Sequence, residues 1–395
     1  LPDSVTEFTE LLYGADWGYK YRGWSLNNEY FFRSIFDFAG ADVDTLFDWG
    51  YYAQLGYFIV PKKLEVAGRY STVIGNSIAI IAGGNAVVFN PHPSAKECSA
   101  RTIVTINQAI IEAGGPANLV TGIANPTIES AQELMKHPGT ALTLVTGGGE
   151  VVKGAMSSGK RAICAGPGNP PVVVDETADL ELAAKGILKG ASFDNNIICT
   201  DEKICAVVES VADQLINNLR GLGARILTAD ELQRLEKVIF SEPMKPGKMT
   251  GLNKKMIGQN PSVILKEIGV TVGDEVRLAI AQVPREHTLV WTEQMMPIFP
   301  IVRVKNADEA IDFGLAAEGN RRHTAVMYSR QLDNLSRMAK ESNVSIFVKN
   351  GPNLAGLGYG GEGFCSFSIA GTTGEGMTRP RTFTRERRCV LVDSF

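Results

Sequence analysis

The stretch from residue 192 to residue 203 carries the clearest chemical signal in the chain. Cys199 lies there, between a helix-like run that ends just before the stretch and an apolar, strand-like run from Ile204 to Val208. A side chain on such a junction loop can face a cleft while its backbone is held from both sides. Lys203 adds a positive charge that would favour the nucleophilic thiolate. Most free cysteines are small buried hydrophobes, and spacing alone leaves that alternative open.

A second candidate site is the glycine turn at Thr146, Gly147 and Gly148, which follows a buried apolar run and opens a helix-like run. Backbone N–H groups and the helix dipole at such a turn attract an anion, and glycine permits a nucleotide to approach closely. The turn lacks the spacing of the G-x-G-x-x-G fingerprint. An ordinary strand-to-helix turn is therefore an equally good interpretation.

Two more residues are candidates for ligand contact. His92, in the loop Asn90-Pro91-His92-Pro93, could meet a phosphate or an adenine, and a solvated loop histidine is the alternative. Glu293 follows the run from Thr288 to Trp291, which we predict to be a strand. A carboxylate at a strand end can bind ribose hydroxyls, and a surface glutamate is the alternative.

Regular elements must position these residues. The pattern predicts strands at 85–89, 119–123, 142–145, 161–165, 171–174, 204–208, 288–291, 301–304, 324–327, 345–348 and 387–392, and helices at 71–82, 94–113, 127–136, 150–158, 178–190, 211–219, 230–239, 307–317 and 331–341. Ser94 is the expected N-cap of its helix, and 241–258 is an expected surface loop.

The alternation of strands and helices, joined by short Gly/Pro turns, indicates a parallel sheet covered on both faces. The last strand could pair with another sheet or subunit.

Bulk composition narrows the class of protein. The 395 residues suffice for more than one domain, and 44% hydrophobic and 21% charged residues are ordinary for a globular protein. A net charge of -4 argues against a nucleic-acid binder, and no apolar run is long enough to span a bilayer. Residues 1–10 do not resemble a secretory signal. The six cysteines form no C-x-x-C pair and the four histidines are scattered, so we expect no metal site, no disulfides and a cytosolic setting.

Residues 1–67 differ from the rest of the chain. They hold 17 of its 31 Phe, Trp and Tyr residues, without the spacing of helix stripes or strand alternation. Two hypotheses fit this bias. Either the segment is an aromatic-rich appendage that packs on a partner, or these letters do not record the natural chain.

Several motifs together resemble the aldehyde dehydrogenase superfamily. They lie at 193–199, 169–179, 292–297, 346–352 and 355–358. Within the superfamily, 90–93 and 360–363 are similar to the CoA-acylating enzymes of ethanolamine- and propanediol-type bacterial microcompartments. The resemblance covers about 72–395 and leaves out 1–67.

The resemblance implies an α/β fold with a Rossmann-like NAD-binding domain, an α/β catalytic domain and oligomerisation strands. It implies that Cys199 is the nucleophile and that NAD and coenzyme A are required. Glu293 falls at the nicotinamide-ribose carboxylate, and Thr146, Gly147 and Gly148 fall on the turn that faces the cofactor. His92 is also expected to bind cofactor.

The expected product depends on a missing residue. Hydrolytic members of the superfamily use a glutamate near the position of Cys164 to activate water, and the segment 163–166 contains no carboxylate. A thioester without a base beside it resists water but still reacts with a thiol, so coenzyme A is expected to take the acyl group. Two alternatives stay open. A base from elsewhere in the fold would give a hydrolytic enzyme that releases free acid, and a catalytically silent protein with this fold would bind a shell or partner.

One motif of the superfamily is absent. A Thr-Asn-Pro motif, whose asparagine donates to the oxyanion, is replaced by Ala67-Gly68-Arg69. Loss of such a donor lowers the rate by about 10²–10³. Either the enzyme is weakened, with the backbone N–H of Cys199 as the donor left, or the letters before Ser71 are not those of the natural chain.

The sequence therefore predicts four segments: an unassigned aromatic segment at 1–67, an NAD/CoA-binding domain at 68–176, a catalytic domain at 177–350, and a return to the cofactor domain with an oligomerisation strand at 351–395. The expected substrate is a short-chain aldehyde such as acetaldehyde or propionaldehyde. We expect a homodimer or homotetramer in the cytoplasm, inside a microcompartment, with the shell or its signature enzyme as a possible partner and without nucleic acid or membrane.

Overall fold

The computed structural model describes residues 7–21, 24–39, 46–57, 64–362, 364–390 and 392, with side chains from Val73 onward. The chain divides into two compact units, Leu1–Ala67 and Gly68–Phe395. Among the described residues, none of the helices combines the length and the apolar character needed to cross a bilayer.

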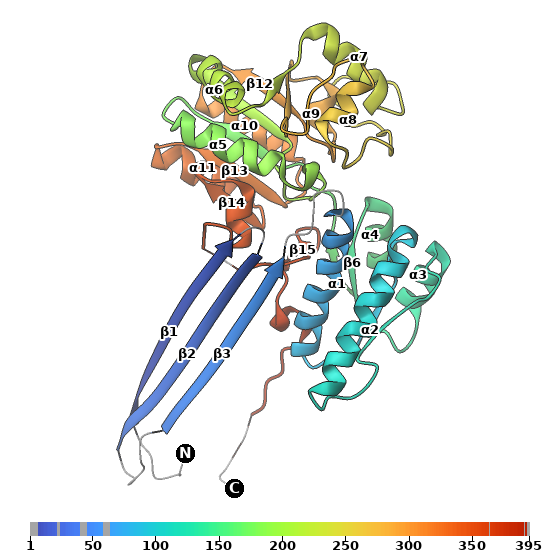
Figure 1. Ribbon diagram of the computed structural model, residues 1–395, viewed down its shortest axis with the longest axis vertical. Helices are drawn as coiled ribbons and strands as arrows, with labels where there is room; N and C mark the ends of the chain where they lie inside the picture. Colours follow the sequence, from blue (N-terminus) through green and yellow to red (C-terminus); the bar gives the residue numbers. More distant parts are fainter. Residues whose placement is uncertain are drawn as a thin grey trace. The chain divides into compact units, whose positions relative to one another are not determined.

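The first unit is a three-stranded antiparallel sheet. Its strands are β1 (Glu7–Tyr21), β2 (Trp24–Ala39) and β3 (Leu46–Tyr57), in the order β1-β2-β3 (Figure 1). The sequence left this segment unassigned, and the spacing of its aromatic residues did not indicate these strands. Aromatic side chains favour strand backbone by themselves, so dense aromatic content supports strands even where polar and apolar residues do not alternate.

The second unit is built around a seven-stranded sheet in which all the strand pairs are parallel. In spatial order the strands are β10 (Arg225–Ile226), β11 (Ala279–Gln282), β12 (Ile298–Val304), β9 (Ile204–Val208), β8 (Pro171–Val174), β13 (Thr324–Tyr328) and β14 (Ile346–Lys349). Because neighbouring parallel strands begin at the same edge of a sheet, the loops that enter β8, β9 and β13 can bring functional side chains together at that edge.

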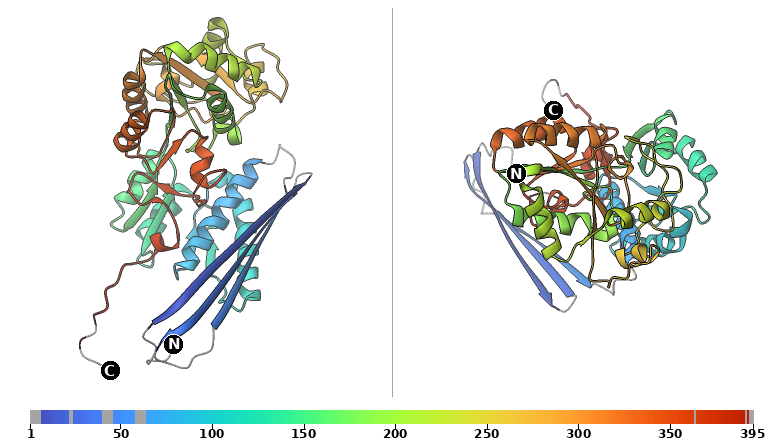
Figure 2. Two further views of the ribbon diagram at one scale, coloured as in Figure 1. Left: turned by 90° about the vertical axis from the view of Figure 1, so that its left-hand side faces the viewer. Right: turned by 90° about the horizontal axis from the view of Figure 1, so that it is seen from above.

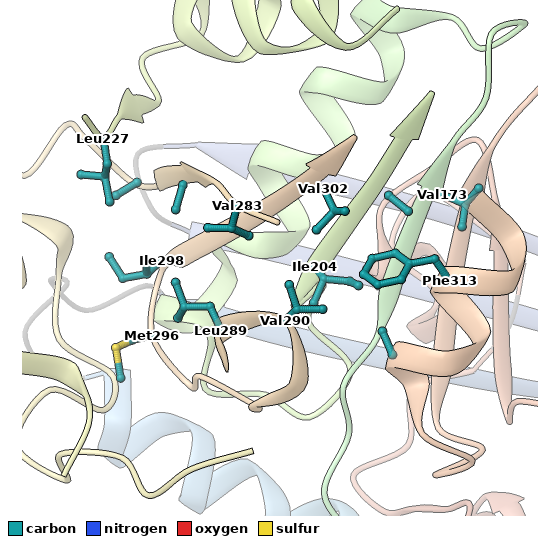
Figure 3. Close-up of a cluster of buried hydrophobic side chains, with 14 of the residues drawn as sticks. Val173, Ile204, Leu227, Val283, Leu289, Val290, Met296, Ile298, Val302 and Phe313 are labelled. Atoms are coloured by element: carbon teal, nitrogen blue, oxygen red, sulfur yellow. The ribbon is translucent and has the colours of Figure 1, made fainter. Parts of the chain in front are cut away.

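Helices cover both faces of this sheet. On β9, Ile204, Ala206 and Val208 pack in one apolar cluster, while Cys205 and Val207 pack in another. The first cluster includes residues of α10 (Ala307–Glu318) and α11 (Leu332–Ser342), and the second includes residues of α5 (Leu180–Ala191) and α6 (Glu209–Gly221). Figure 3 shows part of the first cluster, with Val173, Ile204 and Phe313 lying together. Burial on both faces explains the continuous apolar runs in the sequence.

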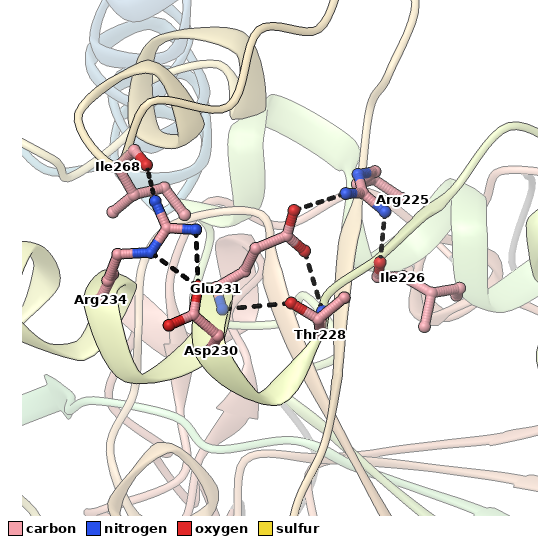
Figure 4. A network of polar contacts seen from close by, with 7 residues as sticks. All are labelled: Arg225, Ile226, Thr228, Asp230, Glu231, Arg234 and Ile268. Atoms are coloured by element: carbon pink, nitrogen blue, oxygen red, sulfur yellow. Dashed lines mark hydrogen bonds and ion pairs between the residues drawn. The ribbon is translucent and has the colours of Figure 1, made fainter.

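Polar contacts fix the helix that follows β10. Thr228 and Glu231 form a capping box at the start of α7 (Ala229–Ile239), because each side chain accepts the other's backbone N–H. Arg225 donates to the same glutamate at 2.6 Å, and Arg234 donates to the carbonyl of Ile268 (Figure 4). The latter contact ties α7 to the segment after α8 (Pro261–Lys266), a helix that the sequence pattern did not predict.

The part of the unit before β8 carries shorter sheets. Its helices are α1 (Leu64–Ala82), α2 (Lys96–Glu112), α3 (Ile128–Lys136) and α4 (Gly149–Met156), and its parallel pairs are β4 (Val87–Phe89) with β5 (Val120–Gly122) and β6 (Leu142–Thr146) with β7 (Arg161–Ala165). Later in the chain, β15 (Ile369–Ala370) pairs with β16 (Gly376–Met377). Since β8 pairs with β9, the chain enters the large sheet through 166–170, before the boundary expected at 176.

Three local predictions are wrong. The run from Thr288 to Trp291 is a short helix, α9, because the ring of His287 accepts the N–H of Leu289 at its start. Ser94 does not cap α2, because it lies inside the 3₁₀ turn Pro93–Ala95 that the ring of His92 caps. Residues 387–390 and 392 form no strand, and Leu391 lies outside the described residues (Figure 2). A strand needs a neighbour to pair with, and this segment has none among the described strands.

We predict that two glycines of α5 are required for this helix to pack closely against the large sheet. A Cβ at Gly186 would overlap the hydroxyl of Tyr328, and one at Gly190 would overlap the carboxylate of Glu202. Gly186→Ala should therefore lower the free energy of unfolding by about 1–3 kcal/mol, the usual effect of overpacking. Denaturant unfolding measures it. Gly154→Ala in α4 is the control, since its Cβ meets no atom within 4 Å, and equal stability of the two variants would contradict the prediction.

Candidate active site

The loop that carries Cys199 has an unusual backbone. It contains the 3₁₀ turn Phe193–Asn196, in which Asp194, Asn195 and Asn196 have φ values of 45°, 51° and 63°. This left-handed region is strained for most residues, but aspartate and asparagine tolerate it best after glycine. The sequence Asp-Asn-Asn therefore suits the turn, and Cys199 follows it, half-buried, before β9 begins.

Lys203 holds this loop from the inside. The residue is fully buried, and its Nζ donates to the carbonyl oxygen of Asn196 at 2.6 Å, to the side-chain oxygen of Asn196 at 2.7 Å and to the carbonyl of Ile198 at 3.1 Å. The amide of Asn196 in turn donates to the carbonyls of Ala191 and Glu202 at 2.7 and 2.9 Å. One ammonium thus fixes the backbone on the N-terminal side of Cys199.

The C-terminal side of Cys199 is held by a second set of buried polar groups. Asp201 accepts the N–H of Ile198 at 3.1 Å and the amide of Asn353 at 3.1 Å. Glu202 accepts the backbone N–H of Asn353 at 2.9 Å. Sequence reasoning did not identify Asp201 or Glu202, because carboxylates are expected at the surface.

Gly168 is the point at which the reactive groups meet. Its N–H donates to Oε1 of Glu293 at 3.2 Å. A Cβ built on it would overlap the carbonyl oxygen of Cys199 and lie 3.3 Å from Cγ of His323. The structure therefore brings the predicted residues Cys199 and Glu293 to one place, although Glu293 follows helix α9 rather than a strand.

His323 is a member of this site that sequence reasoning missed. The residue is 2% exposed, its Nδ1 lies 3.0 Å from the hydroxyl of Thr324, and its Nε2 has no hydrogen-bond partner among the described residues. Burial and the positive charges of Lys203 and Arg321 lower its pKa to about 4. The imidazole is therefore neutral at neutral pH and can accept a proton. Its position directly before a buried strand was the available signal.

The electrostatics of the site keep the cysteine protonated at rest. Burial, and then the negative charge of Glu293, raise the pKa of the Cys199 thiol to about 12, while Lys203 lowers it. Burial also raises the pKa of Glu293, against the lowering effect of Lys203. The expected help from Lys203 is thus present but smaller than the effect of burial. Attack by the sulfur requires a neighbouring proton acceptor. The candidates are Glu293, whose charge acts on the thiol, and His323, whose ring lies near Gly168 as the Cys199 backbone carbonyl does.

The chain also matches a known family of proteins. Residues 70–367 match the model of the aldehyde dehydrogenase family. The chain belongs to this family. Both the resemblance of the sequence motifs and the predicted α/β fold class are thereby confirmed, and residues 1–67 fall outside the matched range.

Several relatives show which branch of the aldehyde dehydrogenases is most similar. The acetaldehyde dehydrogenase (acetylating) EutE of Salmonella typhimurium is 52% identical over 326 residues, which is 82% of this chain and 70% of that protein. The propionaldehyde dehydrogenase of the Clostridium phytofermentans fucose utilisation bacterial microcompartment is 40% identical, with a TM-score of 0.79 over 83% of this chain and 74% of that one. The Rhodopseudomonas palustris propionaldehyde dehydrogenase, solved with bound CoA and an acylated cysteine, is 44% identical, with a TM-score of 0.78 over 81% and 72%.

The predicted cofactor residues of this aldehyde dehydrogenase lie on two other turns. Gly148 is the N-cap of α4, which has no side-chain cap, and a Cβ at Gly148 or Gly149 meets no atom within 4 Å. The turn after β6 is therefore open and suited to an anionic group. Thr146 lies 3.2 Å from the hydroxyl of Ser368. His92 is exposed and contacts Ser94 at 2.7 Å, apart from the contacts that define the Cys199 site.

A carboxylate does approach Cys164 from elsewhere in the fold. The N–H of Cys164 donates to the hydroxyl of Thr373 at 2.9 Å, and that hydroxyl donates to Glu375. Burial, and then the charge of Glu375, raise the pKa of the Cys164 thiol. The segment 163–166 lacks a base, but Glu375 gives the hydrolytic alternative a specific residue to test.

We predict that Gly168→Ala disables the site. The added Cβ would displace the Cys199 carbonyl, and a displacement of about 1 Å at a reacting group can lower the rate about 10²-fold. Steady-state NADH formation from a short-chain aldehyde measures the effect, and circular dichroism verifies folding. Gly221→Ala, whose Cβ meets no atom within 4 Å, is the control. A folded Gly168→Ala enzyme with wild-type activity would contradict this geometry.

We also predict an unusual pH dependence for alkylation of Cys199. Because its pKa is raised to about 12, the thiolate fraction should grow about tenfold per pH unit across pH 7–10, whereas a thiol of ordinary pKa, about 8.5, levels off within that range. The rate of iodoacetamide labelling at Cys199, followed by peptide mass spectrometry, measures this. N-acetylcysteine in the same buffers is the reference, and a plateau for Cys199 near pH 8 would disprove the assignment.

Proposed function

We propose that this chain oxidises a short-chain aldehyde, such as acetaldehyde or propionaldehyde, with NAD and transfers the acyl group to coenzyme A. The observation that carries the proposal is the meeting of Cys199, His323 and Glu293 around Gly168. It pairs a nucleophile with two proton acceptors, the buried His323 and the half-buried Glu293, in a chain similar to acetylating and propionaldehyde dehydrogenases. The balanced reaction is aldehyde + CoA + NAD⁺ giving acyl-CoA + NADH + H⁺.

Cys199 begins the reaction. Its sulfur attacks the aldehyde carbon, and the thiol proton passes to a neighbouring base. His323 can take this role because its ring is neutral and Nε2 has no partner in the described part of the chain, and its lowered pKa makes it a weaker base than an ordinary imidazole. Glu293 is the second acceptor, and its raised pKa makes it a stronger base than an exposed glutamate. The same two groups can remove the proton of the CoA thiol when it attacks the thioester on Cys199.

The turn after β6 is the proposed position of the cofactor. Thr146, Gly147 and Gly148 would hold NAD there, with the open backbone of the turn facing its phosphates, and Glu293 and His92 complete the proposed contacts. When bound, NAD accepts the hydride from the aldehyde carbon. The oxyanion relies on the backbone N–H of Cys199, since Gly68, in helix α1, offers no side-chain donor.

The assembly and setting are also proposals. We propose that residues 68–170 with 351–395 form the cofactor side and that 171–350 form the catalytic part. The chain would form a homodimer or homotetramer. The similarity to a fucose utilisation microcompartment enzyme supports a place in the lumen of a bacterial microcompartment, with its shell or signature enzyme as partner.

The decisive experiment compares NADH formation from propionaldehyde with and without CoA. We expect turnover to require CoA, Cys199→Ala to abolish it, and incubation with aldehyde and NAD⁺ alone to leave an acyl adduct on Cys199, seen by peptide mass spectrometry. Full turnover without CoA would favour the hydrolytic alternative. Wild-type protein without turnover or adduct would favour a silent binding protein.

Glu375→Gln completes this experiment. The hydrolytic alternative requires a base, and Glu375 is the carboxylate beside Cys164. If thiol attack releases the product, the variant should retain CoA-dependent turnover. A loss of free-acid formation in this variant alone would instead identify Glu375 as a water-activating base.

A further inference from the structure

Glu318 is a buried carboxylate that the proposed mechanism does not use. It is the last residue of α10 and is 2% exposed. Its Oε1 accepts the backbone N–H of His323 at 3.0 Å, and its Oε2 accepts the backbone N–H of Arg321 at 2.9 Å. A buried carboxylate needs such donors to offset the loss of water. Both donors belong to the short segment that ends at His323.

This segment follows a strained path. Gly319, Asn320 and Arg322 have φ values of 69°, 56° and 56°. A left-handed arginine is uncommon and is kept only where surrounding contacts impose it. Without the two bonds to Glu318, the segment could relax toward ordinary backbone angles.

Contacts on the opposite side hold the same segment. The N–H and the hydroxyl of Ser345 donate to the carbonyl of Arg322 at 3.0 and 2.9 Å, and the N–H of Ile346 donates to the carbonyl of His323 at 3.1 Å. Those bonds fix the carbonyl groups, whereas Glu318 fixes the N–H groups. The backbone of His323 is therefore clamped between α10 and β14.

The position of this backbone determines where the ring of His323 lies. Apart from the 3.0 Å contact of Nδ1 with Thr324, no hydrogen bond among the described residues aims the ring, since Nε2 has no partner. The ring lies against Gly168, where Cys199 and Glu293 also meet. A shift of the backbone at His323 would therefore move the imidazole relative to Gly168 and the Cys199 loop.

We infer that Glu318 is a positioning residue, whose carboxylate holds the backbone of His323 so that the imidazole stays at Gly168, next to the Cys199 loop. The inference rests on the proposed function. Glu309 provides a contrast on the same helix, because its Oε2 accepts the N–H of Lys305 at 2.6 Å. That bond is of the same kind, but it lies in the first turn of α10 rather than at the residue that leads into His323.

The test is a double-mutant cycle in the full-length enzyme. Glu318→Gln keeps the size of the side chain but turns an NH₂ group toward one of the two N–H donors. We expect kcat for CoA-dependent propionaldehyde oxidation to fall about 10²-fold, the effect of a misplaced catalytic group, with little change in KM for the aldehyde. Glu309→Gln, at a half-buried carboxylate in the first turn of α10 that also pairs with Arg285, should remain within about threefold of wild type.

The cycle separates positioning from a general structural role. If Glu318 acts only through His323, adding Glu318→Gln to His323→Ala should lower kcat no further, whereas independent effects would multiply. Multiplied losses, or a folded Glu318→Gln enzyme with wild-type kcat, would overturn the inference. If Glu318→Gln does not fold by circular dichroism, Glu318→Asp is compared in the same two backgrounds. Absence of CoA-dependent turnover in the wild type would instead count against the proposed function.

Discussion

The buried ammonium of Lys203 is the interaction on which the rest of the site depends. A charge taken out of water must be surrounded by compensating groups, and loss of one partner from such a cluster typically costs about 3–5 kcal/mol. Here the three acceptors are oxygen atoms of Asn196 and Ile198, residues of the loop that leads to Cys199. The fold therefore cannot bury Lys203 without also building the left-handed turn that presents the cysteine.

The same charge sets the chemical state of the reactive groups. Burial lowers the pKa of Lys203, and the nearby acids, Asp201 first, raise it. The field of Lys203 in turn lowers the pKa of Cys199, Glu293 and His323. For the thiol this effect is smaller than that of burial, so the resting site holds a thiol and a neutral imidazole rather than an ion pair. Proton transfer must then accompany attack, which is why the distance between ring and sulfur matters so much.

The sequence predicted the parts of the fold whose signal is local. The buried strands 161–165, 171–174 and 204–208 agree with β7, β8 and β9, because strands covered on both faces read as continuous apolar runs. The run 288–291 has the same composition but is a helix, because the ring of His287 caps it. The segment 387–392 alternates like a strand, yet a strand also requires a neighbour, and the pattern of one segment cannot supply that information.

The same distinction between local and long-range information applies to the residues of the candidate site. Cys199 could be found from the sequence because a junction loop and its motif mark it locally. His323 joins the site only through its approach to Gly168, which is distant in the sequence, and Glu318 matters only through its bonds to the segment that ends at His323. Their position is set by the parallel pairing of β13 with β8, which brings the end of α10 to the loop 166–170. That loop leads from β7 into the large sheet, and its glycine leaves room for the sulfur-bearing loop on one side and the imidazole on the other. A larger residue at 168 would separate the nucleophile from its bases even if every catalytic side chain were kept, so the smallest residue in the site determines whether the larger ones can act together.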